Sequence, residues 1–571
     1  MYQLTIIIGC LSALLVQFLV KFYNARRQMQ KLQRAGSPMP PFSFLTGHSS
    51  AFKSVISTLP RDATMHTILH KLSEGFPGGV FYLNLWPLYS GTWAVVTSPR
   101  VAVQVQALNL PKPETSRGPV DTITGGPSLT TMSGDVWKRW RTLFNPGFSS
   151  NYLLQLAPLV VKEVEVFCGL LREQARKGEM VQLEDFTLRL TVDLIAVVAL
   201  SCENRDTRLH FQTQPIPLAL ALQRQIEWAS FGSTLNPLRR YLTIRPLVLW
   251  YNARRMNTLI SAEIDKRHAE LDDESTSGGP DIEKKSPGPP KSKSVMFLAL
   301  KQYLAEQKHA GVGQKKSMDS FKKIMTSQLC LFLFAGRDTT SSTLLYCFYL
   351  LRKHGKVLER VREEHSRVLG SDDVREAGRI INESPHKLNQ LHYTTAVIKE
   401  TLRLFAPAAA MREGRAGVDL VDDDGRRCPT EGCYVWSVTP AIHRNKRAWG
   451  ETADEFRPER WLHENQANED GTTDGTHDSA FPDPGKGAWR PFEPGPRNCI
   501  GQTLVMLELR IALVMTLREF DIVPAYAEWD AKQPDQGVKT VDGERAYQAV
   551  KADGGEHPAD GLPCRVHVRE Y

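Results

Sequence analysis

The sequence predicts a mainly α-helical protein with small β-sheets (α+β), preceded by one N-terminal transmembrane helix. Three observations favour this fold class. Apolar residues recur at helical spacing through most of the chain, strand-like alternation is confined to short runs towards its two ends, and an uncharged apolar segment opens the sequence. Of the 571 residues, 42% are hydrophobic and 23% are charged, a composition typical of a globular protein with a large core.

Charge and cysteine content exclude several classes of protein. The net charge of +8 is modest for this length, and no concentrated basic run with interleaved aromatic residues occurs, so nucleic-acid binding is not expected. The nine cysteines are odd in number and scattered, unlike a secreted disulfide framework, which favours a reducing compartment. Cys428 and Cys433 lack the second half of a zinc site.

The N-terminal segment predicts a membrane anchor over residues 1–21. Leu4–Val20 contains no formal charge and would span about 26 Å as a helix, enough for the thin bilayer of the endoplasmic reticulum. A cleaved signal peptide is the alternative, but no positive charge precedes the run and no small-residue cleavage site follows it. Five basic residues follow instead and place the body of the protein on the cytosolic side of a single-pass anchor: Lys21, Arg26, Arg27, Lys31 and Arg34.

Residues 22–41 are interpreted as a basic, proline-rich hinge that ends in Pro38, Pro40 and Pro41, and residues 42–571 as the catalytic domain. Two segments of this domain, 272–294 and 464–487, are rich in Ser, Gly, Pro and charged residues and poor in apolar ones. We predict that both are disordered surface insertions.

The first strands and helices of the domain are indicated by periodicity. Phe81–Trp86 and Trp93–Val96 predict two strands around a turn at Ser90–Gly91. Trp137 and Arg141 lie four residues apart in a helical pattern that ends near Pro146–Gly147, so both side chains can reach one anion. Further helices are predicted over Leu153–Leu171, Phe186–Leu200 and Pro217–Ile264.

Phe321–Leu351 predicts the longest helix of the domain. It is apolar on nearly all sides, and a second transmembrane helix is the alternative. Arg337 and Asp338 at its middle would each cost about 2.5–3.5 kcal/mol in a bilayer, which favours a buried core helix. Gly336 removes side-chain bulk, and the Thr339 hydroxyl can bond to a backbone carbonyl and loosen the helix.

A cysteine loop, Phe492–Gly501, precedes a strongly apolar helical run, Gln502–Leu517. A cysteine placed directly before a helix has its sulfur near the helix N-terminus, where an anion is favoured. Cys499 is therefore a candidate thiolate, with an inert buried cysteine as the alternative. Arg497 offers a planar donor for a carboxylate, and together the two residues suit an iron porphyrin with propionates.

This loop resembles the cysteine loop of the cytochrome P450 family. The family pattern Phe-x-x-Gly-x-Arg-x-Cys-x-Gly is met at Phe492, Gly495, Arg497, Cys499 and Gly501, although Glu493 stands where many members have a second glycine. The resemblance covers residues 38–571. It implies the cytochrome P450 fold and a haem b cofactor, with Cys499 as the axial thiolate ligand of the iron and with Phe492 and Arg497 at the cofactor.

Other parts of the chain match the same family. Trp137 and Arg141 correspond to its Trp-x-x-x-Arg element, which implies that they hold a haem propionate. Arg412 and His443 are further candidates for propionate contacts, and for His443 a core histidine is the alternative interpretation.

Glu400 and Arg403 share a helix face, which by itself most often indicates a surface ion pair. In the family this pair is buried and joined by a downstream arginine, here Arg460. The resemblance therefore implies a structural cluster that locks the cysteine loop onto the core.

The helix around Asp338 and Thr339 resembles the oxygen-activating helix of the family, which implies that these two residues deliver protons during oxygen activation. Substrate contacts are expected in the loop Pro113–Met132, at Phe334 and Ala335, and near Ala408–Ala410. A C-terminal hairpin is expected from strands at Tyr547–Val550 and Cys564–Val568, around residues 553–555.

The resemblance implies an oxidoreductase of the monooxygenase type, using molecular oxygen to hydroxylate, epoxidise or desaturate an apolar small molecule. The insertions and loops of this sequence resemble those of fungal family members that act in secondary metabolism. An NADPH–cytochrome P450 reductase is the expected electron donor, with cytochrome b5 as an additional candidate. Two alternatives stay open: a reductase-independent haem isomerase or dehydratase, and a haem sensor or electron carrier without turnover.

Overall fold

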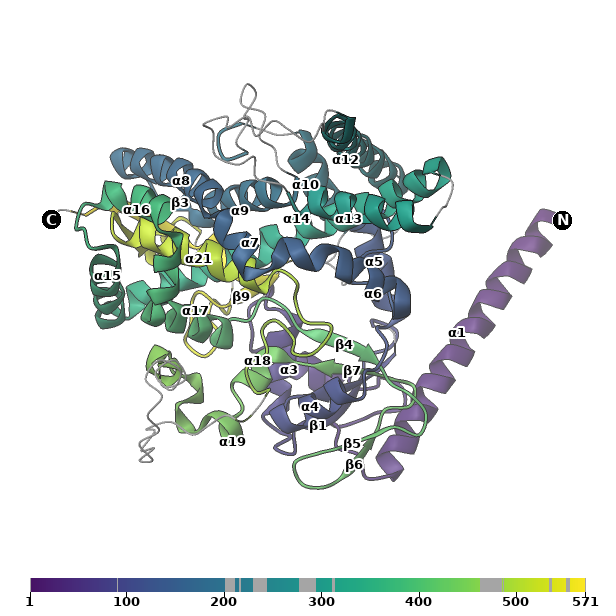
Figure 1. Cartoon of the computed structure of the whole chain (residues 1–571). Coiled ribbons are helices and arrows are strands. Elements are labelled where there is room, and N and C mark those ends of the chain that lie inside the picture. Colours follow the sequence, from purple (N-terminus) through teal and green to yellow (C-terminus); the bar gives the residue numbers. More distant parts are fainter. Residues whose placement is uncertain are drawn as a thin grey trace.

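The computed structural model describes residues 2–89, 91–200, 211–214, 217–229, 244–276, 294–310, 314–462, 485, 487–533, 537–550 and 555–569. Helices predominate in these residues, and the strands form four small sheets. Figure 1 shows most of the helices on one side of the body and the largest sheet on the other, with α3, α4 and α18 beside the sheet. The predicted fold class is confirmed.

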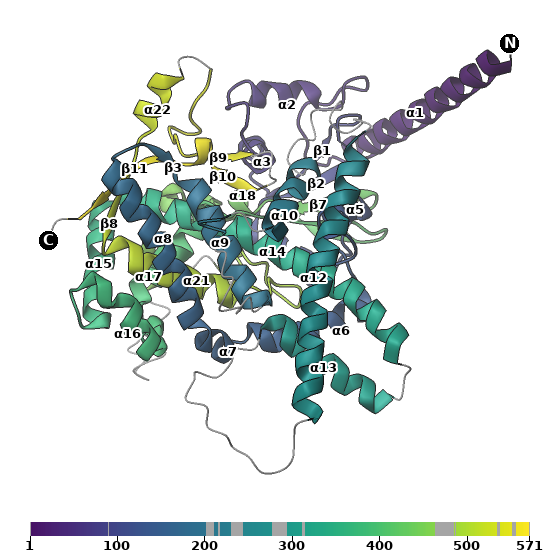
Figure 2. The same ribbon diagram turned by 90° about the horizontal axis from the view of Figure 1, so that it is seen from above.

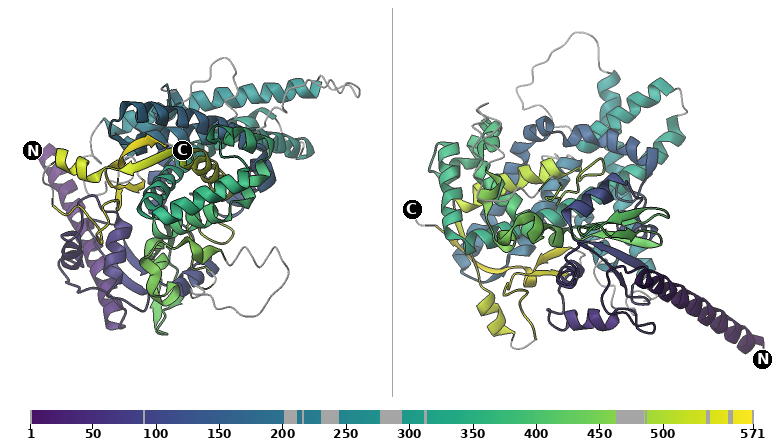
Figure 3. Two further views of the ribbon diagram at one scale, coloured as in Figure 1. Left: turned by 90° about the vertical axis from the view of Figure 1, so that its left-hand side faces the viewer. Right: turned by 90° about the horizontal axis from the view of Figure 1, so that it is seen from below.

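The first helix, α1, spans Tyr2–Arg34 and projects from the body (Figures 1 and 3). Among the described residues it is the single helix long and apolar enough to cross a membrane. Its apolar half is exposed, whereas Arg26, Met29 and Leu32 are buried against the body. Residues 22–34, interpreted from sequence as part of a hinge, therefore continue the helix.

Arg26 fastens α1 to the body. Its side chain is 1% exposed, and it donates hydrogen bonds to Asn84 Oδ1 at 2.8 Å and to the Trp86 carbonyl at 2.9 Å. A third, longer bond of 3.3 Å reaches the Leu45 carbonyl. These bonds join the C-terminal part of α1 to the end of the first strand.

The largest sheet has the order β1-β2-β7-β4, with β2 and β7 parallel and the other pairs antiparallel. Val435 on β7 lies between Ala94 on β2 and Arg412 on β4, so this sheet joins the N-terminal strands to a segment more than 300 residues later. Its strands are β1 Val80–Asn84, β2 Thr92–Val96, β4 Ala410–Glu413 and β7 Cys433–Ser437, flanked by α2 Ser49–Ile56, α3 Met65–Ser73, α4 Pro99–Ala107 and the hairpin β5 Asp419–Val421 and β6 Arg427–Pro429.

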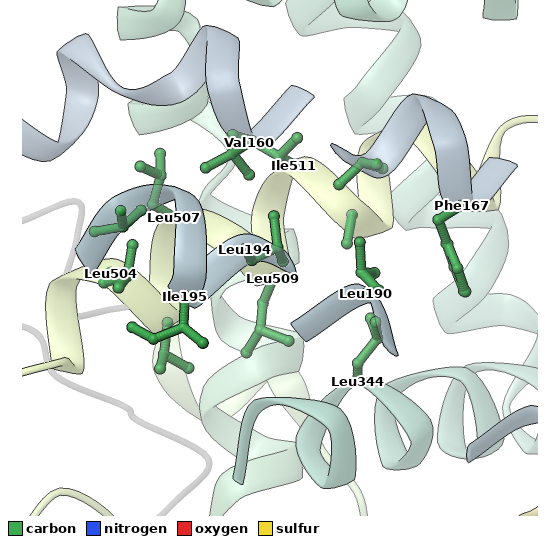
Figure 4. Close-up of a cluster of buried hydrophobic side chains, with 14 of the residues drawn as sticks. Val160, Phe167, Leu190, Leu194, Ile195, Leu344, Leu504, Leu507, Leu509 and Ile511 are labelled. Atoms are coloured by element: carbon green, nitrogen blue, oxygen red, sulfur yellow. The ribbon is translucent and has the colours of Figure 1, made fainter. Parts of the chain in front are cut away.

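The helical core is built around α14, Gln314–Lys353, which packs along α9, Leu183–Leu200. Buried side chains of α8 (Ala157–Lys177), α9, α14 and α21 (Gln502–Leu517) interdigitate there, as Figure 4 shows for Val160, Leu190, Leu344 and Leu509. Arg337 and Asp338 on α14 are themselves buried. The prediction of a buried core helix over residues 321–351 is confirmed.

The remaining helices surround this core, and two of them differ from expectation. The predicted helix 153–171 is divided into α7 and α8, and the segment 113–132, expected as a loop, contains α5. Their bounds are α5 Glu114–Thr124, α6 Gly134–Phe144, α7 Ser150–Gln155, α10 Pro217–Ala229, α12 Arg245–Thr276, α13 Val295–Ala310, α15 Gly355–Leu369, α16 Ala377–Glu383, α17 His392–Leu404, α18 Thr439–His443, α19 Lys446–Trp449 and α22 Tyr526–Lys532.

The C-terminal strands pair differently from the predicted hairpin. β9, Gln548–Val550, pairs with β10, Glu556–Pro558, whereas β11, Pro563–Val568, pairs with β8, Phe520–Pro524, and with β3, Val181–Gln182. The prediction that residues 547–550 pair with residues 564–568 is wrong, because a third short strand follows the turn and takes the place beside β9. Figure 2 shows β9 and β10 at the side of the molecule that carries α3.

The two predicted insertions lie largely outside the described residues. Of the first, residues 272–276 form the end of α12 and Ser294 precedes α13. Of the second, residues 485 and 487 alone are described.

Replacing Arg26 with methionine tests the docking of α1. We expect Arg26→Met to lower the free energy of unfolding by about 1–3 kcal/mol, because the buried Asn84 side chain and two partly buried carbonyls lose their donor. Thermal unfolding of the detergent-solubilised protein measures this change. Arg27→Met, at an exposed neighbour, is the matched control. Equal unfolding midpoints for the two variants would contradict the docking.

Candidate active site

A cavity of about 1100 Å³ lies between α14, β4, α5, α6 and the segment that leads into α21. It is larger than the ~300–1,000 Å³ typical of small-molecule sites. Apolar side chains form much of its wall, among them Leu331, Phe332, Ala335, Leu504 and Val505. The cavity can therefore hold a large, flat, mainly apolar group together with a smaller molecule.

The cysteine loop forms one wall of this cavity. The Cys499 amide donates to the Phe492 carbonyl at 2.8 Å, and the Asn498 amide donates to the Gly495 carbonyl at 3.0 Å, so the loop folds back on itself. Gly495 has a φ of +94° and Glu493 a φ of +52°. Both lie in the left-handed region that glycine favours.

The Cys499 side chain is exposed into the cavity, next to the first turn of α21. Burial by the surrounding protein raises the pKa of its thiol, while hydrogen bonds from the Gly501 and Gln502 amides and the charge of Arg141 act to lower it. Because burial is the largest of these effects, the pKa of the Cys499 thiol is raised overall. A bound metal supplies a positive charge and deprotonates a coordinating thiol.

Basic side chains line the cavity near this loop. Arg141 donates to the carbonyl and to the side-chain oxygen of Asn498, both at 2.9 Å, so α6 is joined to the residue before the cysteine. Arg497 donates to the Met132 carbonyl at 2.9 Å and lies over the Trp137 ring at 4.4 Å. Each of these cations is held in place and still lines the cavity.

Arg412 and Arg490 complete the cationic wall. Arg412 projects from β4 and lies 3.7 Å from the Glu493 carboxylate, while an Arg490 terminal nitrogen lies 3.6 Å from the same group. Arg490 is 5% exposed, and neither of its terminal nitrogens makes a hydrogen bond within the described part of the chain. A buried guanidinium with unsatisfied donors indicates a site for an anion, such as a carboxylate.

Three residues that line the cavity were not predicted from the sequence: the basic residues Lys112 and Arg490, and the acidic residue Glu508. Burial and the charges of Arg412 and Arg497 lower the pKa of Lys112 to about 8. Burial raises the pKa of Glu508, on α21, to about 8. No motif marks Lys112, which lies far from the cysteine in sequence, whereas Arg490, two residues before Phe492, could have been included in the loop.

The residues present therefore fit a haem. The sulfur of Cys499 can ligate its iron, the apolar walls can enclose the porphyrin, and the cations can hold its propionates. Trp137, Arg141, Arg412, Phe492 and Arg497, all expected at the cofactor, line the cavity.

Glu400, Arg403 and Arg460 form a buried cluster behind the loop. Arg403 donates to both Glu400 oxygens at 2.9 Å, and Arg460 donates to Oε1 of Glu400 at 3.0 Å. The side chains of Glu400 and Arg403 are fully buried. The structure thus brings together the three residues expected to form a structural cluster.

His443 links this cluster to the cysteine loop and does not line the cavity. Its Nδ1 lies 3.0 Å from the Arg403 carbonyl, and its Nε2 accepts from the Arg490 amide at 2.9 Å. Burial lowers the pKa of His443 to about 3. The expected propionate contact is contradicted because both ring nitrogens bond to the backbone, which agrees with the alternative of a core histidine.

The centre of α14 forms another part of the cavity wall. The Thr339 hydroxyl donates to the Ala335 carbonyl at 2.8 Å, as predicted, and both residues line the cavity. Gly336 also lines it, and a Cβ added there would lie 3.0 Å from Ile195, so this glycine permits close packing of α9 as well. Asp338 does not line the cavity.

The expected substrate-contact positions are mostly at the cavity. Ala335, Ala408–Ala410 and several residues of α5 line it. Phe334 does not, because it packs into the helical core.

Comparison with known proteins identifies the family. The cytochrome P450 family model matches residues 52–542 of this chain. The chain belongs to the cytochrome P450 family. This cytochrome P450 is accordingly an oxidoreductase, as its sequence predicts, and the family implies a haem with a cysteine thiolate ligand.

Two relatives extend the comparison over nearly the whole chain. The cytochrome P450 monooxygenase polC of Polytolypa hystricis is 37% identical, with 100% of this chain and 96% of that protein covered. The cytochrome P450 monooxygenase acrF of Aspergillus aculeatus is 33% identical, with 89% and 97% covered. Both are fungal proteins.

The crystal structure of the cytochrome P450DA heme domain has a TM-score of 0.68 to this cytochrome P450. It is 20% identical, and the match covers 94% of this chain and 98% of that one. The likeness shows that the cytochrome P450 fold is present.

Replacing Glu400 with glutamine tests the buried cluster. We expect Glu400→Gln to destabilise the fold by about 3–5 kcal/mol, because two buried guanidinium groups lose their counter-charge. The thermal unfolding midpoint of the purified protein measures the loss. Glu383→Gln is the control, since its pair with Arg379 is at the surface. A Glu400→Gln variant as stable as this control would show that the cluster does not support the fold.

Proposed function

We propose that this cytochrome P450 is a haem-thiolate monooxygenase that oxidises an apolar small molecule. The observation that carries the proposal is the cavity that has the Cys499 sulfur on one wall and Thr339 on another, with cations along its side. A bound haem b would supply the iron, ligated by Cys499, that activates molecular oxygen.

Besides Cys499, six residues that line the cavity would hold the cofactor. Trp137, Arg141, Arg412 and Arg497 would donate to its propionates, and Phe492 would line the porphyrin site. Arg490 joins them because its terminal nitrogens are buried and lack hydrogen bonds among the described residues.

Thr339 and Asp338 deliver protons to the reacting oxygen. Thr339 faces the cavity, and its hydroxyl can exchange its bond to the Ala335 carbonyl for one to a ligand. Asp338, the next residue on α14, carries the carboxylate that resupplies the proton.

The substrate is proposed to be a small apolar molecule of fungal secondary metabolism. Ala335, Ala408 and Ala409 leave apolar space between α14 and β4, and the residues of α5 close the cavity beside them. The similarity to fungal monooxygenases supports a substrate from fungal secondary metabolism. The substrate carbon nearest the activated oxygen would be hydroxylated, epoxidised or desaturated.

Electrons would come singly from an NADPH–cytochrome P450 reductase, with cytochrome b5 as a second donor. The apolar helix α1 supports a single-pass anchor in the endoplasmic reticulum membrane, with the basic residues from Lys21 onward holding the body on the cytosolic side. Donor and acceptor then share one membrane face.

The ligand assignment is tested by the absorption spectrum of the dithionite-reduced protein under carbon monoxide. We expect the strongly red-shifted Soret band of a thiolate-ligated haem in the wild type and its loss in Cys499→Ser, because a serine hydroxyl does not provide a soft anionic ligand. Cys428→Ala, at a buried cysteine outside the cavity, should keep the band. A folded Cys499→Ser variant with an unchanged band would overturn the assignment.

Thr339→Ala tests the delivery of protons. With reductase, NADPH and a converted substrate, we expect product per NADPH to fall at least about tenfold and hydrogen peroxide to rise, because a positioned proton donor contributes ~10²- to 10⁴-fold. Thr340→Ala, at the adjacent buried threonine, is the matched control.

An unchanged yield of product per NADPH in Thr339→Ala would count against this role of Thr339 in proton delivery. Product formed without NADPH would instead identify an isomerase or dehydratase, and an intact carbon monoxide band without any turnover would identify a sensor or electron carrier.

A further inference from the structure

A buried cluster of three ionisable residues lies behind α14, on the side away from the cavity. His557 on β10 has its Nε2 2.9 Å from Asp338 Oδ1, and its Nδ1 2.9 Å from Glu184 Oε1 on α9. The exposed fractions are 2% for His557, 7% for Asp338 and 0% for Glu184. Neither His557 nor Glu184 lines the cavity or belongs to the expected site.

The imidazole lies between two carboxylates in this cluster, within hydrogen-bond distance of Asp338 and at ion-pair distance from Glu184. The hydrogen-bond geometry joins Nε2 of His557 to Asp338 Oδ1, an acceptor when ionised, whereas Nδ1 of His557 and the Glu184 carboxylate are close without forming a hydrogen bond to each other. An ionised carboxylate in the interior is costly without such a partner. The orientation of the Asp338 carboxylate therefore depends on His557.

The C-terminal hairpin also encloses this carboxylate. A Cβ added to Gly555 would lie 1.7 Å from Asp338 Oδ2, so the hairpin backbone is in direct contact with the carboxylate. The Ser342 hydroxyl, one turn along α14, donates to the Glu556 carbonyl. Three consecutive residues, 555–557, thus contact α14 around Asp338, and β10 packs on this helix (Figure 2).

Asp338 and Thr339 are neighbours on α14 but face different sides. Thr339 lines the cavity, whereas the Asp338 carboxylate is directed to His557. The carboxylate can approach the cavity side only by leaving or sharing its contact with the imidazole. The contact therefore sets how readily Asp338 supplies a proton.

We propose that His557, held by Glu184, is a positioning residue that fixes the Asp338 carboxylate and thereby makes the β9–β10 hairpin part of the proton-delivery machinery. This inference rests on the proposed function, in which Asp338 and Thr339 deliver protons. A purely structural contact would instead affect stability alone.

Two conservative variants separate these roles. Glutamine at position 557 can place its amide nitrogen where Nε2 donates to Asp338, whereas asparagine is shorter and can replace only Nδ1, towards Glu184. We expect His557→Gln to behave as the wild type and His557→Asn to behave as Asp338→Asn. Glu184→Gln keeps the side-chain volume and leaves His557 in place. We expect it to alter the re-oxidation rate in the same direction as His557→Asn, but by less.

The readout needs neither a substrate nor a reductase. The full-length holoprotein is reduced with dithionite and mixed with air-saturated buffer in H2O or D2O, and its re-oxidation is followed by absorption. Because reduced oxygen takes up protons, we expect Asp338→Asn and His557→Asn to change the rate and its solvent isotope effect alike, by about threefold or more. His365→Asn, at a buried histidine that contacts Thr394, is the matched control.

A second readout is independent of haem chemistry. The unfolding midpoints of Asp338→Asn, His557→Asn and the double variant form a mutant cycle, and for a direct contact the double variant should shift by less than the sum of the single shifts. Additive shifts would overturn the contact.

The outcomes distinguish this inference from the proposed function. Wild-type re-oxidation in Asp338→Asn and Thr339→Ala would remove the proton-delivery role itself. If re-oxidation changes in Asp338→Asn and Thr339→Ala but is that of the wild type in His557→Asn and Glu184→Gln, the positioning role of His557 is overturned and the proton-delivery role is kept. Equal defects in His557→Gln and His557→Asn would also overturn it, because the glutamine retains the donor to Asp338.

Discussion

The buried ion cluster centred on Glu400 is the interaction on which the rest of the site depends. One carboxylate faces two guanidinium groups, and the excess positive charge is met by backbone carbonyls: Arg403 donates to those of His443 and Ala453. The Arg457 amide and the Trp461 indole also donate to Glu400. Because ion pairs in the interior are favourable only when all their partners are satisfied, this cluster specifies one arrangement of the segments around it. His443 extends that arrangement to Arg490 and hence to the cysteine loop.

A second constraint is the division of α14 into two functional faces. Thr339 and Ala335 face the cavity, whereas the Asp338 carboxylate contacts Gly555 and His557 of the C-terminal hairpin. The Thr191 hydroxyl of α9 donates to the Arg337 carbonyl at 2.7 Å, so α9 also contacts the centre of α14 through a hydrogen bond. The same turn of helix is therefore held by packing and hydrogen bonds from two parts of the chain, α9 and the C-terminal hairpin.

Local chemistry was predictable from the sequence, and long-range pairing was not. The cysteine loop, the long core helix and the Glu400–Arg403 spacing are visible because each depends on residues within about ten positions of one another. The position of Lys112 at the cavity and the contact of His557 with Asp338 depend on how distant segments meet. The pairing of β9 with β10 was missed because strands of three residues carry little alternation. His443 was ambiguous because burial, which sequence does not reveal, decides what its ring nitrogens contact.

The rigid start of the chain has a consequence for encounters with other proteins. Helix α1 continues from its apolar half to Arg34 and is fixed to the body by Arg26, Met29 and Leu32, so no flexible tether separates the two. In a bilayer the body would keep a fixed tilt angle to the membrane. The cavity and the cysteine loop would therefore stay at constant heights above the lipid surface. A partner confined to the same membrane would then search by lateral diffusion and by rotation about the membrane normal, a search in two dimensions in place of three.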